Sequence, residues 1–227
     1  MNRHASILLA GLLLGATIPA AAQRAVPLDE VLSGMTAEGN RLETLQVRLD
    51  RDTVNGLVDD HVVDSGELAF DARERRIRVT ITDPATARQD VLVEAGVFRS
   101  FNPRTNQVTM GDLGSNDVAQ FLVVGFGPGN ASLESNFDVT LDGEERVDGV
   151  ATSKIVLVPR SDQVRGNVLR IRLWIDQEHW IPVRQRLDQP GLNYQVVDYS
   201  DVRINSNLSD SDFELDLPDD AEVLRLN

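Results

Sequence analysis

The chain has 227 residues, 41% of them hydrophobic, and a formal net charge of −14 at pH 7. This length fits one domain of ordinary size. Strong acidity repels nucleic-acid phosphates and anionic lipid surfaces, so nucleic acid is not an expected partner. The sequence contains no cysteine, which excludes disulfides, thiolate metal ligands and a lipid anchor on cysteine.

The N-terminus has the pattern of a secretory signal peptide. Arg3 and His4 precede an apolar stretch, and small residues at positions 20–22 offer a cleavage site after Ala22. An uncleaved signal anchor is the alternative interpretation. We therefore expect export and a single domain over residues 23–227. Removal of residues 1–22 takes away one arginine and no acid, so the formal charge changes from −14 to −15.

Two short segments have helical periodicity. The first begins at Pro27, with Asp29 and Glu30 in the turn where the helix dipole favours acids. The second is predicted over residues 115–126, where Ser115 or Asn116 can act as the N-cap. Helices of this length are marginal in water, so we expect both to dock on an apolar surface.

Most of the remaining chain alternates apolar and polar residues with a period of two, which predicts about ten β-strands with hairpin spacing. The predicted strands lie at 45–54, 66–70, 75–82, 90–102 (a pair that turns near Gly96), 137–147, 150–159, 169–176, 181–187 and 194–204. This pattern indicates a meandering antiparallel sheet with one apolar face. A closed barrel, a sandwich or a curved, incomplete barrel filled by the two helices would each cover that face.

No motif for catalysis or cofactor binding is present. His61 and His179 are the two histidines outside the signal peptide, neither lies in a catalytic motif, and no G-x-S-x-G occurs. Residues 210–216 contain alternating oxygens that calcium could use, but they lack the glycine and final glutamate of an EF-hand loop, which favours an acidic turn. We expect no enzyme activity, no cofactor and no metal.

The most glycine-dense stretch is VVGFGPGN, residues 123–130. It departs from the G-x-G-x-x-G pattern, and Pro128 removes a backbone donor that a phosphate loop would use. We interpret it as a helix terminator, with Gly125 or Gly127 in the left-handed conformation and Pro128 preventing continuation. It is also a candidate hinge between the second helix and the strand at Phe137.

The ordered landmarks of the chain resemble the bacterial outer-membrane lipoprotein carrier family, the LolA-like proteins. The resemblance covers roughly residues 28–225 and is clearest in three passages of the C-terminal half: FDVTLDGEERVDGVATSKIVLVPR, LRIRLWIDQEHWIPVRQRL and YQVVDYSDVRINSNLSDSDFELDLPDDAEV. It implies a mainly β fold with short helices, in which an unclosed, strongly curved antiparallel β-barrel has a helical lid over an apolar cavity.

The resemblance also implies a function without chemistry: a soluble monomer that carries the acyl chains of lipoproteins across the periplasm toward the outer membrane. Its partners would be acylated lipoproteins or lipids, an inner-membrane release complex and an outer-membrane receptor. The candidate cavity residues are Leu68, Phe70, Ile77, Val79, Ile81, Val91, Val93 and Phe98. The candidate lid residues are Leu28, Val31, Leu32, Met35, Val118, Phe121 and Leu122.

Members of the family often have an Arg-Pro pair whose arginine can hold the lid closed. This chain has DARERR at the corresponding place, without proline. Arg73 is the nearest match by spacing, with position 72, an alanine, as the alternative, and Arg78 matches a basic residue of the next strand. Arg73 and Arg78 are therefore the candidate latch residues. The alternative function on the same scaffold is an envelope sensor or interaction module that binds a lipid or a protein partner.

Overall fold

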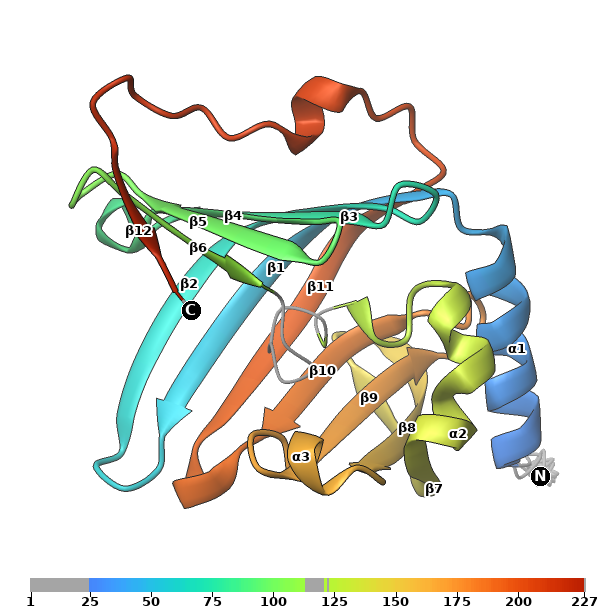
Figure 1. The fold of residues 1–227 in the computed structure, drawn as a ribbon. Helices are drawn as coiled ribbons and strands as arrows, with labels where there is room; N and C mark the ends of the chain where they lie inside the picture. Colours follow the sequence, from blue (N-terminus) through green and yellow to red (C-terminus); the bar gives the residue numbers. More distant parts are fainter. Residues whose placement is uncertain (1–24, 113–120, 122, 227) are drawn as a thin grey trace, which may run out of the picture.

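The structure is a computed structural model that describes residues 25–112, 121 and 123–226. Twelve strands in these ranges form one sheet, ordered β12-β6-β5-β4-β3-β2-β1-β11-β10-β9-β8-β7. The sheet is strongly curved, and its end strands β12 and β7 lie apart (Figure 1). The predicted unclosed, mainly β fold with short helices is therefore confirmed.

The strands are β1 Thr44–Asn55, β2 Asp60–Asp71, β3 Arg76–Asp83, β4 Gln89–Glu94, β5 Val97–Asn102, β6 Gln107–Asp112, β7 Phe137–Val147, β8 Val150–Pro159, β9 Arg170–Asp176, β10 Pro182–Asp188, β11 Tyr194–Ile204 and β12 Glu222–Arg225. The α-helices are α1 Leu28–Arg41, α2 Leu133–Asn136 and α3 Asp162–Arg165. Short 3-10 turns are η1 Ala85–Ala87, η3 Pro128–Ser132, η4 Pro190–Leu192 and η5 Asp210–Phe213.

The alternation of side chains gives the sheet an inner, concave face and an outer, convex face. Two apolar clusters share the inner face. The first is centred on β1–β4 and β11, and the second joins β8–β10 to α1. In the spatial order of the sheet, every pair of neighbouring strands from β6 across to the end strand β7 is antiparallel, as predicted.

Irregular registers accompany the curvature. β11 carries one extra residue opposite Val47, and Asp201 has a φ of 50° at this bulge. Further register shifts lie between β2 and β3, β9 and β10, and β7 and β8. Bulges bend a strand and increase its local twist, so their distribution lets one long meander curve around an apolar interior.

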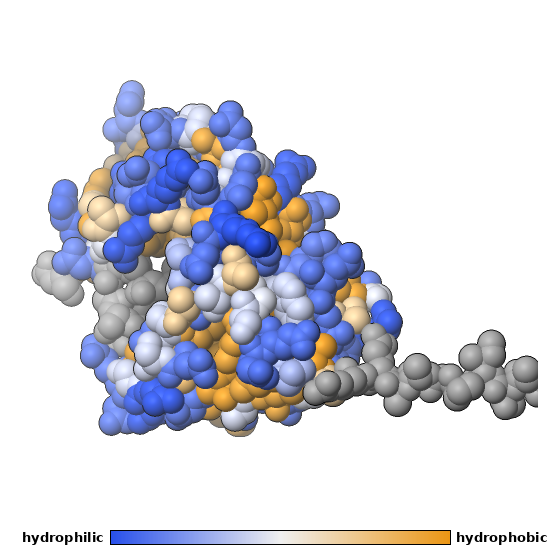
Figure 2. Space-filling view, turned by 90° about the vertical axis from the view of Figure 1, so that its right-hand side faces the viewer, coloured by the Kyte–Doolittle hydropathy of each residue, from blue (hydrophilic) through white to orange (hydrophobic). Residues whose placement is uncertain are grey.

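Helix α1 lies against the β7–β10 side of the curved sheet (Figure 1). It begins directly after Pro27 and buries Val31 and Met35 completely. These positions follow the predicted helical periodicity. On the face seen from the side of α1, patches of apolar surface, in orange, remain among the polar residues (Figure 2).

Two strands are not among the ten predicted, β6 and β12. β12 pairs with β6 in parallel, with Val223 opposite Val108, and is the exception to the antiparallel meander. All four residues of β12 are exposed, so no alternation of burial marks it in the sequence. The preceding segment, residues 205–221, crosses the outer face of β3–β6 (Figure 1). We call this segment the C-terminal strap.

The glycine-rich stretch leads into η3, α2 and β7. Gly125 has a φ of 97°, as expected for a residue that ends a helix, whereas Gly127 has extended backbone with a φ of −128°. The predicted helix over 115–126 falls largely outside the described residues. Of the described residues in this range, Phe121 and Val123 have 3-10 conformation and residues 124–126 form turns or bends, so none of them is α-helical.

Candidate functional site

The eight predicted cavity side chains all belong to one cluster on the inner face. The strand register aligns them in rows across β2–β5: Leu68 faces Val79 and Val79 faces Val91, while the next row is Phe70, Ile77, Val93 and Phe98. Ile81 follows on β3. A continuous apolar surface therefore spans four strands, and we call these eight side chains the inner apolar face.

The inner apolar face is buried on one side and partly exposed on the other. Leu68 is completely buried, and Ile81 is 2% exposed. Phe70, Val91 and Phe98 are only half-buried, although they pack against the same cluster. Half-buried aromatic and aliphatic side chains at the margin of a buried surface are where an apolar ligand could begin to contact it.

Phe126 packs in the same apolar cluster as the inner apolar face. Its side chain is 2% exposed and belongs to the same cluster. Its ring meets the ring of Tyr199 edge-on, with centroids 5.0 Å apart. Edge-to-face aromatic pairs of this kind contribute roughly 1 kcal/mol beyond the burial of their area. Phe126 lies in the glycine-rich stretch of the sequence but is not among the predicted lid residues.

A buried polar connection fixes the segment that carries Phe126 to the sheet. Gln185, 1% exposed, donates from Nε2 to the carbonyl oxygen of Phe121 at 2.9 Å. Tyr199 donates its hydroxyl to Oε1 of Gln185 at 3.2 Å. Burial raises the pKa of Tyr199 above its ordinary value, so the hydroxyl stays protonated and keeps donating. Buried polar groups satisfied in this way set a specific position for the segment.

The predicted lid residues pack on the second cluster rather than on the inner apolar face. Val31, Met35 and Phe121 are buried in it, and Leu28 and Leu32 are partly buried against it. Val118 and Leu122 lie outside the described residues. Helix α1 therefore covers the β8–β10 side, whereas Phe126 belongs to the cluster on the β1–β4 side.

Asn130 connects α1 to the glycine-rich stretch. This buried side chain donates from Nδ2 to the carbonyl oxygens of Met35, at 2.9 Å, and Gly125, at 3.0 Å. Close backbone contact adds to this link, because a Cβ on Gly39 of α1 would lie 2.3 Å from the carbonyl oxygen of Gly127. An asparagine directly after Gly-Pro-Gly is visible in the sequence, but nothing in the sequence indicates which helix it reaches.

The two candidate latch arginines bond elsewhere in this structure. Arg73 is largely exposed and pairs with Glu43. Arg78 lies on the outer face, where Nη2 pairs with Oδ1 of Asp90 at 3.1 Å and Nη1 donates to the carbonyl oxygen of Asp212 at 3.4 Å. Among the described residues, neither arginine bonds to α1, so a latch role for them stays a prediction.

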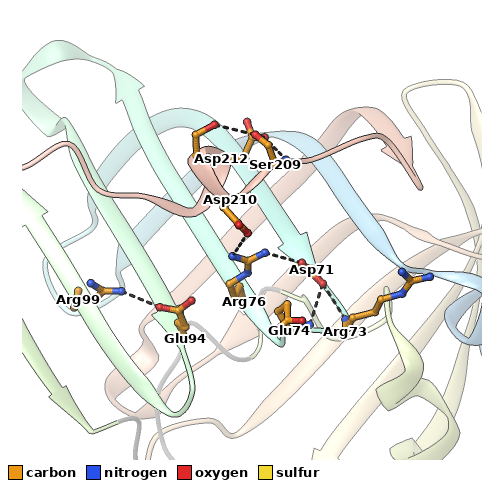
Figure 3. Close-up of polar contacts among 10 residues, drawn as sticks. Asp71, Arg73, Glu74, Arg76, Glu94, Arg99, Ser209, Asp210 and Asp212 are labelled. Atoms are coloured by element: carbon orange, nitrogen blue, oxygen red, sulfur yellow. Dashed lines mark hydrogen bonds and ion pairs between the residues drawn. The ribbon is translucent and has the colours of Figure 1, made fainter.

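The outer face carries a second polar site beneath the C-terminal strap (Figure 3). Arg76 pairs with Asp71 and with Asp210 of the strap, both at 2.9 Å, and its guanidinium lies 4.4 Å from the ring centre of Phe213. Burial raises the pKa of Asp71, but hydrogen bonds from the Glu74 amide, Arg76 and the Arg73 amide outweigh it and hold the pKa below its ordinary value. A pocket of about 350 Å³ lies beside this cluster.

Among the described ranges, no three histidine or acidic side chains gather as metal ligands would. Within the same residues, no helix is both long and apolar enough to cross a membrane.

A long, unclosed antiparallel sheet with an apolar inner face and short helices packed against it defines the LolA-like class of folds. The model of the MucB/RseB N-terminal domain family matches residues 85–216, which are 132 of the 227 residues. The chain therefore belongs to the MucB/RseB N-terminal domain family. A search of curated proteins finds no match.

The chain is similar to several solved structures at low sequence identity. An uncharacterized conserved protein from Thermus thermophilus is 14% identical, with a TM-score of 0.57 over 87% of this chain and 98% of that one. A LolA superfamily protein from Nitrosomonas europaea is 17% identical, with a TM-score of 0.45 over 85% of this chain and 99% of that one. A structure of the MucA/MucB complex of Pseudomonas aeruginosa is 18% identical, with a TM-score of 0.47 over 82% of this chain and 61% of that one. At 14% identity the Thermus thermophilus structure shows the fold alone, and the other two, with TM-scores below 0.5, support no conclusion.

Proposed function

We propose that the protein is a non-catalytic periplasmic carrier that holds the acyl chains of lipoproteins, or of related lipids, on the inner apolar face. The observation that carries this proposal is the pair of aligned rows across β2–β5, which share one apolar cluster with the side chain of Phe126. The signal-like N-terminus and the membership of a family with a LolA-like fold support export to the envelope.

The energetics favour a surface of this kind for acyl chains. Removing each CH₂ group of an acyl chain from water contributes about 0.8 kcal/mol. Aliphatic side chains such as Val79 and Ile81 offer contacts but no hydrogen bonds, so they select for apolar bulk rather than for a headgroup. The headgroup or polypeptide of the cargo would remain in water beyond the half-buried margin at Phe70 and Phe98.

Release requires that the unloaded state also be stable. In this structure Phe126 occupies the inner face and buries apolar surface that would otherwise meet water. When a ligand displaces Phe126, the protein loses these contacts and gains contacts with the ligand. The free energies of the loaded and unloaded states therefore differ by less than the full value of acyl burial. A carrier needs this balance, because it must accept cargo from an inner-membrane release complex and deliver it to an outer-membrane receptor.

The second candidate function is an envelope sensor that binds a lipid or a protein partner without transporting it. The observation in its favour is the family itself, since MucB has been solved in a complex with MucA. This chain covers 61% of the MucB chain in that complex, so partner binding by the whole of MucB is carried to this chain only as a proposal.

A binding and transfer assay with a fluorescent diacylated peptide tests the proposal. The matched pair of variants is Phe98→Asp, on the inner apolar face, and Val97→Asp, which is also half-buried but points to the outer face. We expect the protein to take up the peptide and to pass it to acceptor vesicles, with uptake lost in Phe98→Asp and kept in Val97→Asp. Uptake without transfer would favour the sensor, and equal loss in both variants would contradict the assigned face.

A further inference from the structure

Three arginines on the outer face surround a single carboxylate. Asp188, which is buried, accepts on Oδ2 from Nε of Arg170 and from Nη1 of Arg172, both at 2.6 Å. Its Oδ1 accepts from Nε of Arg186 at 2.8 Å. The group carries three positive charges and one negative charge. We call Arg170, Arg172 and Arg186 the arginine cluster.

The strand register makes this charge imbalance unfavourable. Arg172 of β9 lies directly opposite Arg186 of β10, and like charges at directly opposed positions destabilise a sheet. The next residues along the same row are Val156 on β8 and Val196 on β11, which carry no charge. Asp188 therefore neutralises one of three cations. The next acid along the row is Asp52 on β1, which pairs with His61 instead.

Neighbouring cations on the same face are matched individually. Arg184, one row away, pairs with Asp198 directly opposite it on β11. Lys154 pairs with Asp142 at 3.1 Å, so this nearby acid is already engaged. Burial and the neighbouring Arg170 and Arg186 lower the pKa of Arg172 despite the attraction of Asp188, which agrees with a local surplus of positive charge.

The cluster is held in position but keeps free donors. The guanidinium of Arg186 stacks 3.7 Å from the ring centre of Tyr194. Arg170 and Arg186 use Nε to bind Asp188, and in the described part of the chain their Nη atoms have no acceptor. The Arg172 side chain is 21% exposed, so its charge is only partly solvated. Fixed guanidinium groups with free Nη donors match the oxygens of a phosphate group.

We propose that Arg170, Arg172 and Arg186 form a binding site for a phosphate group on the outer face of β9 and β10. The bound phosphate would neutralise the surplus charge, with Asp188 orienting the three guanidinium groups. The phosphate can belong to a soluble phosphate ester or to a phospholipid headgroup. The site faces away from the inner apolar face and does not depend on acyl-chain binding.

The test follows the arginine Nε–Hε resonances of the ¹⁵N-labelled full chain by NMR, as inorganic phosphate replaces chloride at constant ionic strength. We expect saturable shifts at the three arginines of the cluster. Arg170→Gln should weaken binding about tenfold, as expected for one lost charge-assisted bond. Arg184→Gln is the matched control and should leave the affinity unchanged.

A second variant makes the test independent of simple loss of structure. Asp188→Asn leaves three cations without a carboxylate and should tighten phosphate binding, provided that backbone amide shifts show the native fold. Shifts that rise linearly without saturation, or an equal effect of Arg184→Gln, would overturn the proposal. So would unchanged affinity in Arg170→Gln.

Two further probes distinguish the sources of the phosphate. If glycerol phosphate competes with inorganic phosphate at the arginine cluster, a soluble phosphate ester is sufficient for binding. Sedimentation with phosphatidylglycerol vesicles that is lost in Arg170→Gln, with no sedimentation on phosphatidylcholine vesicles, would identify a lipid headgroup at an anionic surface. Failure of both probes, together with no saturation by inorganic phosphate, would refute the site and leave the acyl-chain proposal intact.

Discussion

The side-chain amide of Asn130 donates to the carbonyl oxygen of Met35 across 95 positions of sequence, at 2.9 Å. The same nitrogen donates to Gly125, so one buried residue joins helix α1 to the segment that carries Phe126. This relationship connects the two parts of the covering structure, one over each apolar cluster. Movement of Phe126 away from the inner apolar face is therefore expected to disturb α1.

Removal of the Asn130 amide should loosen α1 without removing apolar contacts. Asn130→Ala leaves two buried carbonyl oxygens without this donor, which should cost about 1–3 kcal/mol of unfolding free energy. Faster hydrogen exchange in α1 and faster exchange of bound acyl peptide are expected. Asn136→Ala is the control, because Asn136 is exposed and makes one long hydrogen bond, at 3.5 Å to Ser132. Equal exchange rates in both variants would contradict the link.

Replacement of Phe126 should increase uptake of the ligand while lowering stability. Phe126→Ala removes the ring from the inner apolar face, and comparable core truncations cost about 3–5 kcal/mol. We expect faster binding of the diacylated peptide in stopped-flow fluorescence. Phe213→Ala truncates another buried phenylalanine, which belongs to the C-terminal strap on the outer face, and should lower stability without accelerating uptake. Acceleration in both variants would indicate general loosening instead.

Because Gly39 contacts Gly127, we expect Gly39→Ala to destabilise the protein, although helix propensity alone predicts the opposite. Alanine in a helix interior is favoured over glycine by about 1 kcal/mol, yet a Cβ on Gly39 would lie 2.3 Å from a backbone oxygen. Gly39→Ala should therefore lower the thermal midpoint and detach α1 from η3. Gly129→Ala is the control, since its Cβ would meet nothing within 4 Å. A higher midpoint in Gly39→Ala would show that the contact relaxes at little cost.

Gly127→Ala tests the hinge that the sequence suggested. The added Cβ would lie 3.2 Å from the ring of Phe70, so the ring must shift slightly, while the backbone of Gly127 is extended and acceptable to alanine. We expect a folded protein with altered exchange of the acyl peptide. Unchanged exchange kinetics in the folded variant would leave these glycines as plain helix termination.

The C-terminal strap should loosen in acid. Hydrogen bonds from the Ser209 amide and hydroxyl hold the pKa of Asp212 below its ordinary value, so this carboxylate stabilises the strap above that value and the stabilisation is lost as pH falls. The pKa of Asp71, which pairs with Arg76, is shifted in the same direction. A fall in the hydrogen-exchange protection factors of residues 206–217, taken relative to the intrinsic exchange rates at each pH, is expected between about pH 5 and pH 3. Asp212→Asn should reduce this pH dependence. If the strap of the unmodified protein is insensitive to acid, the stabilising role of the Asp212 carboxylate is contradicted.

The sheet and its apolar face could be predicted because they follow local alternation. Ile77, Val79 and Ile81 alternate with polar residues, and the register places Val91 and Val93 beside them. β12 could not be predicted in this way, because its residues are exposed and its pairing with β6 is set by a strap that begins more than fifteen residues earlier.

The covering structure was harder to predict, because it depends on contacts between distant segments. Periodicity placed Val31 and Met35 on one face of α1, but it could not show which part of the sheet that face meets. Phe126 ends the predicted helix at 115–126, but periodicity could not show which cluster its ring joins, and Asn130 acts through a helix nearly a hundred residues away. In both cases the partner is determined by tertiary packing rather than by local sequence.

The most direct measurement of the central claim is photo-crosslinking of the full chain with a diazirine-labelled fatty acyl peptide, followed by peptide mass spectrometry. The proposal predicts adducts on the inner-face residues of β2–β5, such as Val79, Val91 and Phe98, and their loss when excess unlabelled peptide competes. Adducts confined to outer-face residues, or no competable adducts at all, would contradict acyl-chain binding on the inner apolar face.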